Sequence, residues 1–371
     1  MRILFIAPIP PPVSGQSKAS KVLLDALMSN KFDISLINLT KKSLKNGFLS
    51  FDRIFEILIV LLKVWRKRNS ADLIYLSLAE SFLGNIRDLL IYAICYKNRG
   101  NIFIHMLGGA GMKIILEQKK CQSYINQFFI KQLGGVIVEG LVNYHMFSKV
   151  IQKEKVHIVP NFAEDFLFAQ DSEIIEKFQD VTNINIIYLS NLIPGKGYDE
   201  LADAHIGLED SIKKQVNINY VGGFESNEAE KLFLEKIKNY PRIKYLGKFI
   251  DGDEKRKLYL NSHIFCLPTY YPFEGQPISI LEAYATGCVV ITTSHSGIPY
   301  IFSDEDNGYI VEKKSISSLQ TAIYRVLDNK KTLKNIAFNN RDVALVKYRA
   351  STYQGKIMQI FKETLQNPAN R

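Results

Sequence analysis

The chain has 371 residues, too many for one ordinary hydrophobic core, and this length indicates two domains. Hydrophobic residues make up 47% and charged residues 23% of the sequence, which excludes an intrinsically disordered protein. The net charge of +10 is unevenly spread: residues 1–160 carry 22 Lys and Arg against 10 Asp and Glu (+12), and the remainder carry 25 against 27 (−2). A basic first half predicts an anionic partner, for which lipid, substrate and nucleic acid are the candidates.

The first half predicts a parallel sheet covered by helices. Short apolar runs bounded by turn residues are typical of buried strands, and strands that alternate with helices favour a parallel sheet. Strands are expected at residues 2–7, 32–39, 72–78, 101–107, 134–140 and 156–161, with helices at 17–30 and 87–100. The apolar stretch 53–68 is interrupted by Glu56 and Lys63, so we expect a buried or interfacial helix there and no membrane span.

The same alternation restarts in the second half. Strands are expected at residues 184–192, 216–223, 263–268 and 288–293, with helices at 198–208, 316–345 and 352–365. We therefore predict an α/β fold of two Rossmann-like, doubly wound domains that face a central cleft. The first domain is expected to span residues 1–165 and the second 166–351, with a terminal helix at about 352–371 packing back on the first.

Glycine-containing turns at the expected strand ends carry candidate ligand-binding residues, because ligands of open parallel sheets bind beyond the carboxyl ends of the strands. In "LIPGKG", glycines flank Lys196, which favours binding of an anion, although a plain surface turn is the alternative. Gly15 precedes a helix and is a second candidate, and Gly222 ends the strand at 216–223. His105 ends a strand before "GGAG" and could contact a substrate hydroxyl, or it could be a structural histidine.

The stretch "PFEGQPISILEAYATGCVV" contains two glutamates in different settings. Glu274 lies in a loop where Gly275 and Pro277 favour a turn whose N–H groups can point at an anion or a sugar. Glu282 lies in the helix expected at 278–287, where apolar neighbours bury it and it needs a partner. Ligand hydroxyls could supply that partner, and a helix-start carboxylate with local capping bonds is the alternative.

Cysteine and histidine spacings argue against a metal centre. The four cysteines form no CxxC pair, and the histidines form no HExxH motif. This usage fits a reducing compartment, and no signal peptide is visible. We therefore expect a cytoplasmic protein with no metal and no other bound cofactor.

Taken in order, these segments resemble the glycosyltransferase family 4 group of GT-B enzymes. The resemblance lies in "FEGQPISILEAYATGCVVITTSHSGIP", "LSNLIPGKGYDEL", "YLGKF", "LYLNSHIFCLPTYY" and "NGYIVE", with a looser match at "PPVSG". It implies a retaining, metal-independent, hexosyltransferase-type enzyme that takes a sugar from a nucleotide-diphosphate donor. It also implies that the first domain binds the acceptor and the second binds the donor.

The resemblance also assigns roles to residues. It implies that Glu274, His105 and Lys196 act in catalysis: Glu274 contacts the donor sugar, His105 approaches the reacting carbon, and Lys196 neutralises the diphosphate leaving group. Glu282 would hold the ribose hydroxyls. The remaining donor contacts implied are Gly15, Gly222, Gly275, Gln276, Pro277 and Ile278. Two departures stand out, because Asn191 occupies the place of a frequent family arginine and the usual double glycine of the first loop is "SG" here.

The basic first half and Arg66–Lys67–Arg68 lead to the hypothesis of a peripheral enzyme at the inner face of the cell membrane. Its acceptor would be a saccharide, lipid-linked, in the synthesis of a bacterial surface polysaccharide such as lipopolysaccharide or capsule. The alternatives are a nucleotide-sugar epimerase of the same architecture, a catalytically dead partner subunit, and a basic nucleic-acid-binding or membrane-binding protein without catalysis. The lysines are scattered and no nucleic-acid-binding motif is present, so no nucleic-acid partner is expected.

Overall fold

The computed structural model describes residues 1–40, 51–108, 110–179 and 181–366. Gly109 of the glycine stretch and residues 367–371 of the expected terminal helix lie outside these ranges. The chain divides into two compact units, one formed by Met1–Asn161 with Thr352–Arg371 and the other by Phe162–Ser351. The sequence predicted a domain boundary after residue 165. The structure divides the chain slightly earlier, after Asn161.

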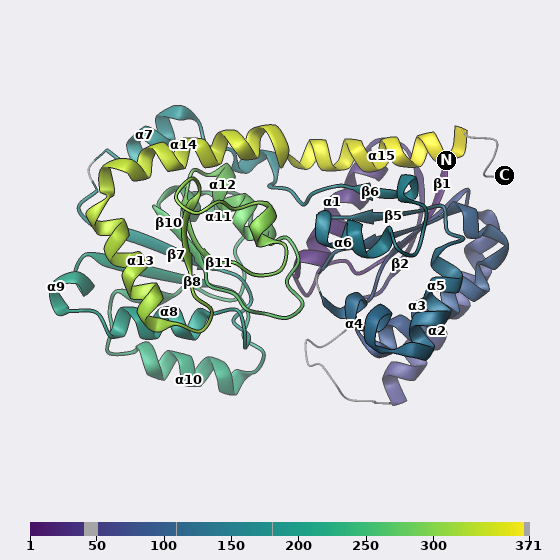
Figure 1. Cartoon of the computed structure of the whole chain (residues 1–371), viewed down its shortest axis with the longest axis horizontal. Helices are drawn as coiled ribbons and strands as arrows, with labels where there is room; N and C mark the ends of the chain where they lie inside the picture. The colour runs from purple at the N-terminus through teal and green to yellow at the C-terminus, as the bar shows by residue number, and fades with distance from the viewer. Residues whose placement is uncertain (41–50, 109, 180, 367–371) are drawn as a thin grey trace. The chain divides into compact units, whose positions relative to one another are not determined.

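The sheet of unit 1 is entirely parallel, and its strand order is β2-β1-β3-β4-β5-β6 (Figure 1). Strands β3, β4 and β5 are buried along their whole length, which is why their sequences are continuous apolar runs. All six expected strands are present: β1 (Arg2–Ala7), β2 (Asp33–Asn38), β3 (Leu73–Ser77), β4 (Ile102–Met106), β5 (Gly135–Val138) and β6 (Val156–Ile158).

Helices α1 to α6 follow the strands of unit 1. Helix α1 begins with a capping box, in which Ser14 and Ser17 satisfy each other's backbone N–H groups. The helices are α1 (Gly15–Ser29), α2 (Phe51–Lys67), α3 (Phe82–Ile94), α4 (Ala110–Gln118), α5 (Lys120–Ile130) and α6 (Leu141–Phe147). Among the described residues, no helix is long and apolar enough to cross a bilayer.

Unit 2 repeats the architecture with the order β12-β11-β10-β7-β8-β9, again parallel throughout. Helices α8 and α13 pack together on one face, and α12 and α14 on the other (Figure 1). The strands are β7 (Ile184–Leu189), β8 (Val216–Val221), β9 (Ile243–Tyr245), β10 (Ile264–Leu267), β11 (Val289–Thr293) and β12 (Gly308–Val311). The helices are α7 (Asp171–Lys177), α8 (Tyr198–Ile206), α9 (Asp210–Lys213), α10 (Asn227–Ile237), α11 (Gly252–Leu260), α12 (Ile278–Ala285), α13 (Ile316–Asp328) and α14 (Lys330–Lys347).

One expected helix is divided in the structure. The segment 316–345 was predicted as a single helix, but it forms α13 and α14 with a break at Asn329, whose φ of −110° and ψ of 28° are not helical. Asparagine favours such a break because its side chain competes for backbone hydrogen bonds, and here its amide donates to the Arg325 carbonyl oxygen. The sequence periodicity continues through the break, which is why the prediction was wrong there.

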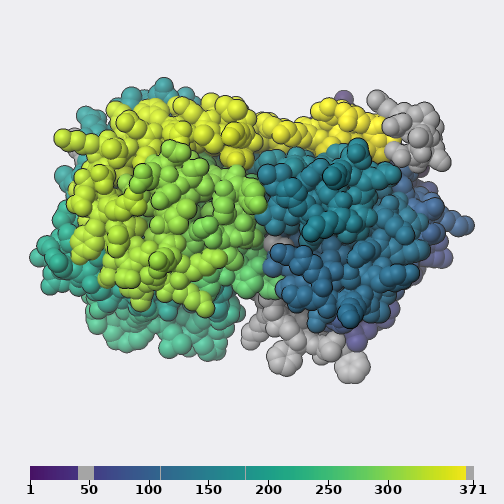
Figure 2. Space-filling model, viewed as in Figure 1, coloured from purple at the N-terminus to yellow at the C-terminus, as the bar shows by residue number. Residues whose placement is uncertain are grey.

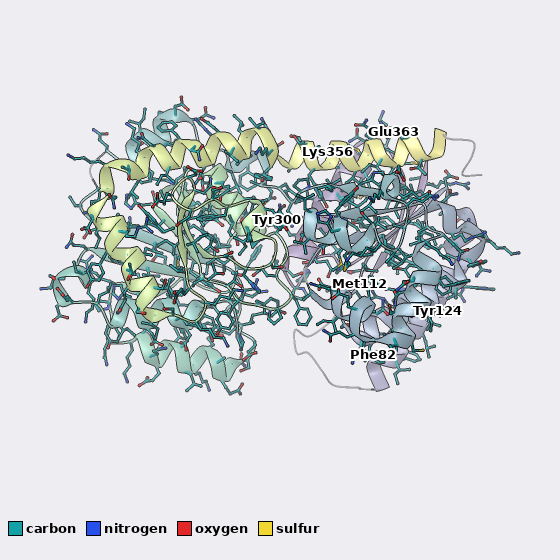
Figure 3. The ribbon with its side chains drawn as sticks, in the orientation of Figure 1. Phe82, Met112, Tyr124, Tyr300, Lys356 and Glu363 are labelled. Atoms are coloured by element: carbon teal, nitrogen blue, oxygen red, sulfur yellow. The ribbon has the colours of Figure 1, made fainter. Side chains whose placement is uncertain are left out.

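Helix α15 (Ala350–Gln366) returns the chain to unit 1 from Thr352 onward. Its Tyr353, Ile357 and Phe361 are buried, and Phe361 packs edge-on against Phe103 of β4, with ring centroids 5.6 Å apart. Figure 2 shows the helix in yellow along the surface of that unit. Lys356 and Glu363 mark its solvent-exposed side (Figure 3).

This packing encloses His105, the last residue but one of β4. The imidazole is 0% exposed, stacks on the Tyr353 ring and lies 2.7 Å from the Tyr75 phenol oxygen through Nδ1. Burial raises the pKa of Tyr75 well above its usual value, so the phenol donates to Nδ1 and the ring proton stays on Nε2. Burial also lowers the pKa of His105 to about 3. These contacts favour the structural interpretation of His105.

We predict that His105→Gln reduces the loss of stability in acid. Because the folded imidazole has a pKa of about 3 and the unfolded one about 6.5, the unfolded chain binds a proton that the folded chain excludes. The free energy of unfolding therefore falls as pH drops below about 6.5, and by pH 4.5 this site accounts for about 2–3 kcal/mol. Urea unfolding at pH 7.5 and pH 4.5 should show that the variant loses less stability by this amount.

The matched control is Lys356→Ala, which changes an exposed side chain of the helix that covers His105. It should lose as much stability between the two pH values as the unchanged protein. If His105→Gln also loses that full amount, the imidazole titrates freely in the folded protein and the enclosed arrangement is wrong.

Candidate donor site at the switch point of unit 2

The loops after β7 and β10 lie where the strand order of unit 2 reverses. Strands β8 and β9 extend to one side of β7, and β11 and β12 extend to the other side of β10. In parallel sheets this switch point is where ligands bind, because the two loops leave the sheet in opposite directions. Lys196 lies in the loop after β7, and Glu274 lies in the loop after β10. Both were named as candidate site residues from the sequence.

Lys196 and Glu274 form an ion pair across the switch point. The Lys196 Nζ atom lies 2.7 Å from Glu274 Oε2 and 3.0 Å from Oε1. Their side chains are only 13% and 8% exposed, and the Lys196 ammonium also lies 5.1 Å from the Tyr271 ring centroid. The structure therefore brings together a cation and a carboxylate that the sequence placed in separate motifs.

Glycines let the β7 loop approach the β10 loop. Gly195 and Gly197 have φ values of +91° and +77°, which side-chain-bearing residues rarely adopt. A Cβ atom on Gly197 would lie 2.4 Å from the Pro268 carbonyl oxygen. The Tyr270 N–H donates to the Gly195 carbonyl oxygen at 2.7 Å, so both glycines hold the Lys196 loop against its neighbour.

Hydroxyl groups also hold Glu274 in place. The Thr269 hydroxyl donates to Glu274 Oε2 at 2.8 Å, and the Ser296 hydroxyl donates to the Glu274 carbonyl oxygen. A Cβ atom on Gly297 would lie 2.7 Å from the Gly275 carbonyl oxygen, so the loop after β11 packs tightly against this turn. Sequence reasoning missed these contacts that hold Glu274 in place.

Gln276, Pro277 and Ile278 lead into α12. Pro277 is the N-cap residue, and no side chain caps the first turn of the helix. Gln276 and Ile278 are buried, at 7% and 8% exposure. The N–H groups of this first turn favour an anion, as the sequence predicted.

Glu282 is the fifth residue of α12, beyond the first turn, so the helix dipole contributes little to it. Its carboxylate is buried and is bound by two side chains of α11. The Lys255 Nζ atom lies 3.2 Å from Oε1, and the Tyr259 phenol donates to Oε2 at 3.2 Å. The sequence predicted that burial would require a partner but identified neither of these. Both lie in a charged helix that is typical of a surface.

Gly222 has a steric reason to be glycine. Its φ is +150°, and a Cβ atom there would lie 1.8 Å from the Ser190 carbonyl oxygen. Asn191, in the place of the family arginine, lies in the same loop as Ser190, and the Tyr188 phenol donates to its carbonyl oxygen. A further cation at this edge is Lys314, whose ammonium lies 4.9 Å from the Tyr270 ring centroid.

Unit 1 has its own switch point between β1 and β3, and Gly15 is the first residue of α1, directly after the loop that follows β1. A Cβ atom on Gly15 would meet no other heavy atom within 4 Å, so packing does not require glycine there. The Gln16 amide donates to the Ser77 hydroxyl at 2.9 Å and joins the two loops. Glu80, which sequence reasoning missed, accepts the Gly111 N–H at the start of α4.

Within the described residues, no group of three or more His, Cys, Asp or Glu side chains is arranged to hold a metal ion. The groups at the switch point of unit 2 include the Lys196 ammonium, the Glu274 carboxylate and the backbone N–H donors at the start of α12. Such a set can stabilise developing negative charge on a phosphate and positive charge on a sugar.

Residues 170–343 match the family described as glycosyl transferases group 1. A curated relative, N,N'-diacetylbacillosaminyl-diphospho-undecaprenol alpha-1,3-N-acetylgalactosaminyltransferase of Campylobacter jejuni, is 27% identical over 213 residues. That match covers 56% of this chain and 53% of the relative, so the chain spans about half the length of the curated protein it matches.

Two solved structures match nearly the whole chain. HepE of Anabaena in complex with UDP superposes with a TM-score of 0.72 and 16% identity over 98% of this chain and 100% of that one. WaaG, a glycosyltransferase involved in lipopolysaccharide biosynthesis, superposes with a TM-score of 0.70 and 14% identity over 96% and 99%. The family match covers the whole sheet of unit 2 with both of its switch-point loops, so unit 2 is similar to the group 1 glycosyl transferases, and the two solved structures show that the chain has the GT-B fold.

Proposed function

We propose that this protein is a retaining glycosyltransferase that moves a sugar from a nucleotide-diphosphate donor to a lipid-linked saccharide acceptor. The observation that carries the proposal is the Lys196–Glu274 pair at the switch point of unit 2, inside the segment that matches the family. The lipid-linked acceptor is supported by the Campylobacter jejuni relative, whose name specifies a diphospho-undecaprenol acceptor. Synthesis of a bacterial surface polysaccharide is the corresponding process.

In the proposed reaction, the bond between the anomeric carbon and the diphosphate breaks, and the oxygen of an acceptor hydroxyl forms the new bond from the same face of the sugar. The proton of that hydroxyl passes to the departing diphosphate oxygen. Negative charge then develops on the leaving diphosphate, and Lys196 stabilises it together with the N–H groups at the start of α12. A diphosphate that approaches Lys196 competes with Glu274 for the ammonium. Glu274 is then free to accept a sugar hydroxyl close to the positive charge that develops on the ring.

The other donor contacts keep their proposed roles. Glu282 accepts the ribose hydroxyls, and Gly275, Gln276 and Pro277 present backbone to the sugar and the phosphates. Gly15 approaches the donor phosphate with its unhindered backbone. His105 is left out of the catalytic group because its ring is fully enclosed and its neutral form is favoured down to about pH 3.

A lipid-linked acceptor requires access to a membrane, and α2 offers an unusual surface for that. Residues Val60, Leu61 and Val64 face the core of unit 1, yet the opposite side of the helix is also apolar. This second side, which we call the α2 face, consists of the exposed Ile54, Phe55, Leu58, Ile59, Leu62 and Trp65. A group of exposed apolar side chains of this size marks an interaction surface, so the α2 face is suited to a nonpolar partner.

Neighbouring helices extend the α2 face and add positive charge. Helix α2 packs against α3 and α3 against α5, which contribute the exposed Phe82 and Tyr124 (Figure 3). Arg68 lies over the Trp65 ring at 5.3 Å, and Lys131 lies over the Phe128 ring at 5.6 Å. Cations interleaved with aromatic rings favour the headgroup region of an anionic bilayer. We therefore propose that unit 1 binds the membrane surface through the α2 face.

We predict different kinetic effects for the two glutamates. Ribose bonds are present before and during the reaction, so Glu282→Ala should raise the donor KM about ten- to a hundredfold and largely keep kcat. Glu274→Gln removes charge beside the reacting carbon and should lower kcat by about 100-fold. The readout is release of nucleoside diphosphate from the nucleotide sugar that gives the largest thermal shift in a screen.

Glu235→Gln, which changes an exposed glutamate of unit 2, is the control and should leave both constants unchanged. Circular dichroism should show that all three variants fold. Near-full kcat in Glu274→Gln would contradict its charge role, and an unchanged donor KM in Glu282→Ala would contradict the ribose assignment.

We predict that activity persists in excess EDTA. Lys196 and the first turn of α12 supply the positive charge that a divalent ion would otherwise bring to the diphosphate. The measurement is the rate of donor cleavage before and after exhaustive chelation. Activity that disappears with EDTA and returns with manganese would refute metal independence and reassign the stabilisation of the leaving group.

We predict that the protein floats with vesicles containing anionic phosphatidylglycerol and that recovery falls with salt. Each basic residue near such a surface contributes about 1 kcal/mol, and the apolar side chains of the α2 face add insertion. Replacing Phe55, Leu58 and Trp65 together by serine should abolish flotation. Leu232→Ser with Phe249→Ser, two exposed apolar residues of unit 2, is the matched control and should float normally.

Equal recovery of the unchanged protein with neutral and anionic vesicles at low salt would contradict the electrostatic part of the proposal. Normal flotation of the triple serine variant would contradict the α2 face as the binding surface.

A further inference from the structure

Lys255 of α11 is a buried cation shared by three carboxylates. Its side chain is 3% exposed, and its Nζ atom lies 2.9 Å from Glu164, 3.0 Å from Asp251 and 3.2 Å from Glu282. A lysine is rarely buried to this extent, because removing the ammonium from water is costly unless carboxylates compensate for it. Asp251 lies on the same helix one turn earlier, whereas Glu164 and Glu282 come from distant parts of the chain.

Tyr259 lies one turn after Lys255, on the same side of α11. Its phenol lies 3.2 Å from Glu282 Oε2, while the Lys255 ammonium is bound to Oε1. Burial, with the nearby charge of Glu282 as a second cause, raises the pKa of Tyr259 well above its usual value, so the phenol remains a donor. Helix α11 thus supplies one donor to each oxygen of the Glu282 carboxylate.

An ionised carboxylate has about four lone-pair sites, two on each oxygen, and Lys255 binds one oxygen of Glu282 while Tyr259 binds the other. Two neighbouring hydroxyls of a ribose could therefore each donate to a different oxygen. A carboxylate that was protonated or rotated would lose one of these acceptors, so the two donors of α11 preserve the form that binds a diol.

We propose that Lys255 and Tyr259 are positioning residues that keep Glu282 ionised and oriented for the ribose hydroxyls of the nucleotide. The proposal rests on the proposed ribose role of Glu282. Without the Lys255 ammonium, three carboxylates would face one another, which favours protonation of at least one of them. Lys255 and Tyr259 themselves do not touch the ligand.

The experiment compares a ribonucleotide with an analogue that lacks both ribose hydroxyls. Calorimetry on the full chain measures the Kd of UDP and of 2′,3′-dideoxyuridine diphosphate, with GDP and ADP and their dideoxy forms if UDP does not bind. The unchanged protein should prefer the ribonucleotide by about tenfold or more. A merely structural role for Lys255 would weaken both ligands equally and leave this preference intact.

Lys255→Met and Tyr259→Phe should each reduce the preference several-fold, whereas Lys255→Arg should keep most of it because the charge is retained. Tyr259→Phe removes only a hydroxyl and decides the question if Lys255→Met does not fold. The matched control is Glu164→Gln, which changes another partner of Lys255 but leaves Glu282 bound, and it should keep the full preference.

The experiment distinguishes failure of the positioning proposal from failure of the proposed ribose role of Glu282. If Glu282→Ala loses the preference but Lys255→Met and Tyr259→Phe both keep it, the positioning proposal is wrong and the ribose role stands. If Glu282→Ala keeps the preference, or if none of the three diphosphates binds, the ribose role itself is wrong and the positioning proposal is wrong with it.

Discussion

The reversal of strand order between β7 and β10 is the constraint on which the candidate site depends. Two loops leave the sheet at this point, and side chains that are 78 positions apart in the chain can then meet. The meeting requires close backbone approach, which explains the left-handed glycines on both sides of Lys196. The sheet topology thus brings Lys196 and Glu274 together, and the glycines allow the close backbone approach that this contact needs.

The ion pairs of Lys196 and of Lys255 in unit 2 are built differently. Lys196 is bound by one carboxylate and a ring face, so a diphosphate of higher charge can displace its partner. Lys255 is shared by three carboxylates and is nearly inaccessible, so it cannot be exchanged in the same way. Buried ion pairs contribute little net stability compared with apolar packing. The proposed functional roles therefore account for these ion pairs better than stability does. In these roles Lys196 is a cation that a ligand can take from its partner, and Lys255 is a fixed support.

The sequence predicted the strands and site residues whose positions depend on the local residue pattern. The central strands are continuous apolar runs, and Lys196 and Glu274 follow such runs directly, so their place at the sheet edge could be inferred. The edge strands β9 and β12 were not predicted. Lys255 and Tyr259 were missed because "GDEKRKLYL" has the composition of an exposed helix. The enclosure of His105 depends on Tyr353, which is distant in sequence and reaches it only through the return of α15.

Helix α2 combines exposed apolar side chains with nearby basic residues, and each of these features alone favours membrane binding only weakly. Its interruption by Glu56 and Lys63 argued against a membrane span, and the structure shows one apolar side in the core and the other exposed. Insertion of a few side chains gives only modest membrane affinity, and so does attraction of scattered basic residues to anionic lipid. The two together would give the proposed reversible attachment, which suits the proposed enzyme, because it would have to reach a lipid-linked acceptor and still exchange a water-soluble donor. That requirement links the basic, apolar surface of unit 1 to the phosphate-binding chemistry proposed for unit 2.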